Sequence, residues 1–209
     1  MTDNNFLIFA LASLVLNITP GADMLYVATR STSQGMKAGI ISALGIGAGC
    51  LLHIIAAVVG LSAIVANSAV AFSIIKFAGA AYLIYLGLKI FLNKRNVFTK
   101  GKIITQKSYS SIFWQGVLTN VLNPKVALFF LAFLPQFIDR SLENIHWQIL
   151  LFGSWFNFSG TIVNILVAIL FGKIGGWLSR SVWFIKIQNK LTGLLLVALG
   201  LKVALSSRK

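Results

Sequence analysis

The chain has 209 residues, of which 57% are hydrophobic and 11% are charged, and its mean hydropathy is +0.87. A soluble domain carries roughly 25% charged residues, so this composition excludes a soluble globular protein and predicts an all-α polytopic membrane protein. We assign the net charge of +14 to loop lysines and arginines that set membrane topology, and therefore expect no nucleic-acid partner.

Six apolar stretches, each long enough to cross a bilayer, follow one another along the chain. They predict transmembrane helices over 5–29, 38–66, 71–92, 111–138, 147–171 and 187–206. The N-terminal residues lack the basic region of a cleavable signal, so we expect the first span to be retained. The basic stretch 93–110 divides the chain into a first three-helix repeat over 1–92, a cytoplasmic linker, and a second three-helix repeat over 111–209.

The two halves resemble each other in sequence. Leu83–Leu92 and Leu196–Leu205 share six of ten residues at an offset of 113, and Pro20 matches Pro124 at an offset of 104. Because each half contains an odd number of spans, the second must be inverted relative to the first. Inverted repeats with interrupted helices are typical of secondary transporters, whose binding site lies at the interruptions.

Basic residues predict the orientation in the membrane. More of them fall in the connections after spans one, three and five, which by the positive-inside rule face the cytoplasm. Both termini are then periplasmic. The residues assigned to the cytoplasmic side are Arg30, Lys37, Lys89, Lys94, Arg95, Lys100, Lys102, Lys107, Lys173, Arg180, Lys186 and Lys190.

Prolines interrupt the first and fourth spans, and a charged residue follows each proline. Since proline has no N–H, Pro20 leaves the carbonyl of Leu16 without its helical donor, and Pro124 does the same to Asn120. Charges this deep in a membrane are costly and usually functional. We therefore predict that both breaks meet near the midplane and form a substrate site from Asn17, Thr19, Pro20, Gly21, Asp23, Asn120, Asn123, Pro124 and Lys125.

The side chains of Asp23, Lys125 and His53 each have more than one interpretation. Asp23 can exchange a proton or attract a substrate ammonium, and Lys125 at the start of a half-helix can hold a carboxylate. Alternatively the two form a buried ion pair, or Lys125 snorkels to the interface. His53 is a second candidate for proton coupling, or a hydrogen-bonded histidine.

Small and amide residues in the second and fifth spans have simpler explanations. Gly45, Gly47 and Gly49 indicate a face for close helix packing. Asn157 and Asn164 are expected to form hydrogen bonds between helices, and Cys50 to be a small packing residue.

Several segments together resemble the LysE/RhtB family of amino-acid exporters, over essentially the whole chain. The matching segments are Thr19-Pro20-Gly21, Arg30-Ser31 with Gln34-Gly35 and Ala38-Gly39, the Gly45–His53 region, Lys76–Gly87, Asn123–Phe130 and Leu134–Phe137. The resemblance implies proton-driven efflux of amino acids or close derivatives across the bacterial inner membrane, without a nucleotide-binding domain. Ala22 replaces a second proline that this family usually carries, so we expect the first break to be milder than the second. The acid at Asp23 varies within the family, which puts an obligatory proton-carrying role for it in doubt.

Other functions fit the sequence less well. Export of a cation needs several oxygen or sulfur ligands, which one buried aspartate and one cysteine do not supply, and we expect neither metal nor cofactor. An intramembrane enzyme is disfavoured because paired membrane aspartates, His-Glu-x-x-His and Gly-x-Ser-x-Gly are absent from the sequence. A membrane assembly protein gives no reason for the charged breaks. The expected partners are thus an amino acid or amino-acid derivative, protons and the lipid bilayer, and a homodimer is a candidate assembly.

Overall fold

The computed structural model describes residues 3–61, 69–92, 106–139 and 144–178, together with scattered positions between 190 and 205. Every regular element in these residues is a helix, in agreement with the predicted all-α class. The elements are α1 (Asp3–Ile18), α2 (Ala22–Gln34), α3 (Met36–Ala56), the π-helix η1 (Ala57–Leu61), α5 (Ala69–Leu92), α6 (Tyr109–Val121), α7 (Pro124–Leu128), the π-helix η2 (Phe129–Phe133), the 3₁₀-helix η3 (Leu134–Phe137) and α8 (Ile145–Leu178).

Several helices are long and apolar enough to cross a membrane. Two continuous ones, Met36–Gly60 and Ile145–Lys173, meet this condition in the described residues, and two bent helix pairs meet it when each pair is one span. The 24-residue α5 and the helical positions between 190 and 205 coincide with the predicted third and sixth spans. Large apolar side chains such as Leu51, Leu122 and Leu166 are exposed on the outside, as a lipid environment requires.

Both predicted breaks are present. Phe6–Ile18 and Ala22–Gln34 meet at 48°, and Tyr109–Val121 and Pro124–Phe137 meet at 43°. The prediction of a milder first break was therefore wrong. Pro20 followed by Gly21 in an extended conformation (φ −157°, ψ −171°) is sufficient to end α1 without a second proline.

The two broken helices run antiparallel, with their breaks side by side. Beyond the first break, α2 lies against α6, where the Tyr26 hydroxyl donates to the carbonyl of Ile112 at 2.8 Å. Before the break, α1 lies against η2 and η3, where the Phe9 ring is 6.3 Å from Phe133 and 5.3 Å from Phe137. Each half of one broken helix thus packs on the opposite half of the other.

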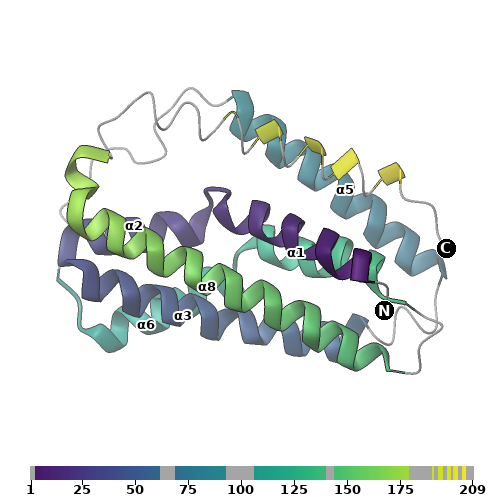
Figure 1. Cartoon of the computed structure of the whole chain (residues 1–209), viewed down its shortest axis with the longest axis horizontal. Coiled ribbons are helices and arrows are strands. Elements are labelled where there is room, and N and C mark those ends of the chain that lie inside the picture. Colours follow the sequence, from purple (N-terminus) through teal and green to yellow (C-terminus); the bar gives the residue numbers. More distant parts are fainter. Residues whose placement is uncertain are drawn as a thin grey trace.

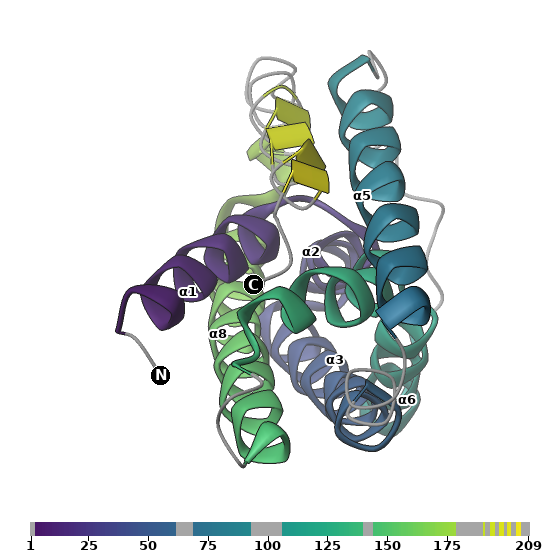
Figure 2. The same cartoon turned by 90° about the vertical axis from the view of Figure 1, so that its right-hand side faces the viewer.

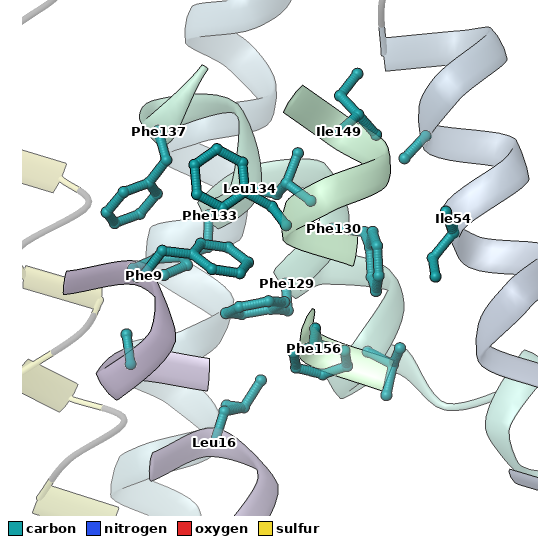
Figure 3. Close-up of a cluster of buried hydrophobic side chains, with 14 of the residues drawn as sticks. Phe9, Leu16, Ile54, Phe129, Phe130, Phe133, Leu134, Phe137, Ile149 and Phe156 are labelled. Atoms are coloured by element: carbon teal, nitrogen blue, oxygen red, sulfur yellow. The ribbon is translucent and has the colours of Figure 1, made fainter. Parts of the chain in front are cut away.

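Aromatic side chains fill the end of the molecule formed by α1, η2, η3 and the start of α8 (Figure 3). Phe9, Phe129, Phe133 and Phe152 are all at most 1% exposed, and the Phe9 and Phe152 rings lie 4.6 Å apart. We call this group, with Phe137 and Phe156, the phenylalanine cluster. It closes one side of the region where the breaks meet.

A polar network occupies the opposite end, between α2 and α6. Arg30 is 5% exposed and donates to the side-chain oxygens of Gln34 (2.8 Å) and Gln115 (3.1 Å). The prediction that Arg30 lies in a loop was wrong, because these amides and the Tyr26 ring, 5.6 Å away, let α2 continue past the charge to Gln34.

Glycines bring the remaining helices close together. A Cβ at Gly45 would meet the carbonyl of Phe113, and one at Gly49 would lie 2.6 Å from the carbonyl of Val117, so α3 and α6 touch backbone to backbone. These two positions agree with the predicted packing face. Long α8 runs beside α3 through the molecule, whereas α5 lies on the other side against η2 (Figures 1 and 2).

Replacing Gly45 by alanine should lower the free energy of unfolding by about 1–3 kcal/mol, because the new methyl group would collide with backbone that cannot rotate away. Unfolding of the purified protein in detergent measures this. Gly60→Ala is the control, since a Cβ there meets nothing within 4 Å. Equal stability of the two variants would contradict the packing described.

Candidate functional site

The side chain of Lys125, from the second break, closes the first break. Its Nζ donates to the carbonyl of Leu16 at 3.1 Å and to that of Thr19 at 2.9 Å. Leu16 is the residue whose carbonyl loses its helical donor to Pro20, and among the described residues it accepts otherwise from the nearby Thr19 N–H at 3.1 Å. Lys125, itself 8% exposed, therefore supplies from the other broken helix the hydrogen-bond donor that Pro20 lacks.

The carbonyl freed at the second break also receives hydrogen bonds. The carbonyl of Asn120, which lacks a donor because of Pro124, accepts from His53 Nε2 at 3.0 Å and from the Asn123 N–H at 2.9 Å. The imidazole also stacks on Phe130 at 6.0 Å. His53 is thus a hydrogen-bonded histidine of the break and does not line the cavity described below.

A second contact joins the two breaks through side chains. Asn120 Nδ2 donates to Asp23 Oδ2 at 2.8 Å, so the amide before Pro124 holds the carboxylate after Pro20. Asp23 and Lys125 themselves form no salt bridge in the described structure, which differs from the ion-pair alternative. Each charge is bound by polar groups of the opposite break.

Local chemistry explains why Lys125 reaches its partners. Asn123 caps α7, with its Oδ1 accepting from the Lys125 N–H at 3.0 Å, and Pro124 takes the first helical position. Across the interface, a Cβ at Gly21 would lie 3.1 Å from Lys125 Nζ, so a larger residue there would crowd the ammonium group.

A cavity of about 30 Å³ lies where the breaks meet, enough for about two water molecules. Among the predicted site residues, five line it, and Pro20, Gly21, Asn123 and Pro124 shape the backbone behind them. The five are Asn17, Thr19, Asp23, Asn120 and Lys125.

Helix α8 forms a wall of this cavity that the sequence-based site omitted. It contributes Phe156, Asn157, Gly160, Thr161 and Asn164. The signal was in the sequence: polar or small residues at 157, 160, 161 and 164 recur at helical spacing on one face of an apolar span. Asn17 Nδ2 ties this wall to α1 by donating to the carbonyl of Phe156 at 3.1 Å.

Three buried polar atoms beside the cavity have no hydrogen-bond partner in the described structure: Asp23 Oδ1, Asn120 Oδ1 and Asn123 Nδ2. Buried polar atoms are almost always paired, so such orphans indicate a ligand or water. The first two are acceptors, and they need donors. The described residues contain no cluster of three His, Cys, Asp or Glu side chains that would hold a metal ion.

Removing the cap at the second break should destabilise the protein. We expect Asn123→Ala to cost about 1 kcal/mol, as for other N-caps, because the Lys125 N–H would lose its acceptor in a buried position. Ser108→Ala removes the corresponding cap of α6 at an exposed position and should cost less. Unfolding in detergent compares them, and a smaller effect for Asn123→Ala than for Ser108→Ala would contradict the assignment.

Comparison with known proteins identifies the family. The chain is 34% identical to an uncharacterized membrane protein, YrhP, of Bacillus subtilis, with 90% of this chain and 93% of the relative covered. It is 31% identical to an uncharacterized membrane protein of Vibrio cholerae (95% and 96% covered) and 24% identical to a leucine efflux protein of Salmonella choleraesuis (96% and 94% covered). No solved structure matches significantly. The family model of LysE type translocators matches residues 14–207, and the chain belongs to that family.

Proposed function

We propose that this protein is a secondary transporter that exports an amino acid, or a close derivative, across the bacterial inner membrane by proton antiport. The observation that carries the proposal is a cavity between two broken membrane helices that contains one acid, Asp23, and one base, Lys125. Family membership and the relative named as a leucine efflux protein support it.

The cavity offers complementary groups to both ends of a zwitterion. Asp23 Oδ1 and Asn120 Oδ1 are acceptors without donors, which suits a substrate ammonium with its three N–H groups. Lys125 uses two of its three N–H donors on carbonyls of the first break, so one is available for a substrate carboxylate. A buried charge without a partner is costly, so a zwitterion fits better than a singly charged ligand.

Asp23 also suggests how protons and substrate are coupled. Its carboxylate binds either a proton or the substrate ammonium, because a protonated carboxyl no longer attracts a cation. When the substrate leaves towards the periplasm, a proton takes its place on Asp23. The transporter then returns to its cytoplasm-facing state with Asp23 neutral. Each cycle exchanges one bound species for the other.

The small volume of the cavity is consistent with alternating access. Room for two waters is too little for an amino acid, so helices must separate before it binds. Parting of α2 from α6 at the Arg30 network would open one side, and parting of α1 from η2 and η3 at the phenylalanine cluster would open the other. In our proposal these are the cytoplasmic and periplasmic gates of six spans in two inverted repeats, with both termini periplasmic.

Transport in proteoliposomes tests the proposal. Counterflow with a panel of amino acids should detect exchange, and an inward proton gradient should accelerate export. Lys125→Met should reduce counterflow at least tenfold, whereas Lys107→Met, which removes an exposed lysine outside the cavity, should not. Asp23→Asn should bring the ratio of rates with and without the gradient to about one.

Two results would contradict the proposed function. If no amino acid or derivative moves, the protein is not this kind of exporter. If Asp23→Asn keeps the full response to the proton gradient, another group carries the proton.

A further inference from the structure

Three of the five α8 residues that line the cavity, Asn157, Thr161 and Asn164, are polar, and the zwitterion model above does not use them. Asn164 is 8% exposed, lines the cavity, and has no hydrogen-bond partner among the described residues. A carboxamide has two N–H donors and an oxygen acceptor, so all of its hydrogen-bonding capacity is open to a ligand. Its polar atoms are not among the fully buried ones, so they face the open space of the cavity and not packed neighbours.

Two neighbours extend the same face by one and two turns. Thr161 Oγ1 lies 3.5 Å from Asn157 Oδ1, which is long for a hydroxyl hydrogen bond and leaves both groups able to turn to a ligand. Gly47 on α3 permits this arrangement, because a Cβ there would lie 2.8 Å from Thr161 Oγ1. The position of the wall is also fixed by Asn17, which bonds to the carbonyl of Phe156 and to Ser159 Oγ at 3.0 Å.

The charges of the cavity restrict what this wall receives. Asp23 and Lys125 are the charged residues that line it, and the proposed function assigns both to the substrate's own ammonium and carboxylate. A charged substrate side chain would find no opposite charge left. An apolar side chain would leave the Asn164 carboxamide unpaired, whereas a hydroxyl or carboxamide would satisfy it.

We propose that Asn157, Thr161 and Asn164 form the side-chain subsite of the transporter and select neutral amino acids that carry a hydroxyl or carboxamide group. This inference rests on the proposed function and adds to it the residues that determine specificity. It also separates this chain from the relative named as a leucine efflux protein, since leucine offers the wall no hydrogen-bonding group.

Matched pairs of substrates test the subsite in proteoliposomes. Threonine and valine have nearly the same shape, as do asparagine and leucine, so each pair differs in hydrogen bonding alone. We expect the wild-type kcat/KM for threonine over valine, and for asparagine over leucine, to be at least tenfold, as expected where a site must hydrogen-bond its ligand. Thr161→Val and Asn164→Leu should each lower at least one of these two kcat/KM ratios threefold or more. Ser154→Ala, a change at an exposed position on the same helix, should leave both ratios unchanged.

The preference is a ratio, so it does not depend on how much of a variant folds. Should a variant fail to fold, competition in the wild type decides: valine and leucine that inhibit as well as threonine and asparagine would overturn the subsite. Amino acids that move without such a preference, or variants that keep it, would refute the subsite and leave the exporter intact. Movement of no amino acid would refute both.

Discussion

Two backbone carbonyls without helical donors, deep among apolar helices, determine how this molecule is put together. In lipid such groups must find partners within the protein, since no water is available. Lys125 satisfies the carbonyl of Leu16, and His53 satisfies that of Asn120. The first of these contacts, together with Asn120 to Asp23, crosses between the breaks. Each break therefore depends on the other, and the antiparallel arrangement of the broken helices follows from this dependence.

In our proposal, the residues that stabilise the two breaks are also those that bind the substrate. Lys125 both completes a helix end and brings a positive charge to the cavity, and Asp23 is held by an amide while keeping one oxygen unpaired. The two gates proposed on either side differ in chemistry. Phenylalanine rings pack by dispersion and area burial, whereas the Arg30 network consists of directional hydrogen bonds. In our proposal the site opens on alternate sides, which needs contacts that can separate without unfolding the helices behind them.

Much of this could be predicted from the sequence, and the reasons are local. Proline chemistry is independent of tertiary structure, so the breaks and the identity of the orphan carbonyls at Leu16 and Asn120 followed directly. The groups that donate to these carbonyls could not be predicted, because Lys125 could equally have snorkelled or paired with Asp23. The severity of the first break was misjudged, since Pro20 with Gly21 already suffices. Arg30 was assigned to a loop because one of the amides that bind it, Gln115, comes from α6 and the other, Gln34, lies at the far end of α2. The α8 wall was missed because its asparagines were read as contacts between helices, and which face of α8 meets the cavity depends on packing.

The central claim is that Lys125 replaces the N–H that Pro20 lacks, and a double-mutant cycle in detergent tests it most directly. Pro20→Ala restores a donor for the carbonyl of Leu16, so Lys125→Met should then cost less unfolding free energy than in the wild type, by about 1–3 kcal/mol. A Pro135→Ala background, where the break is unchanged, should show the full cost. Equal costs in all three backgrounds would contradict the account.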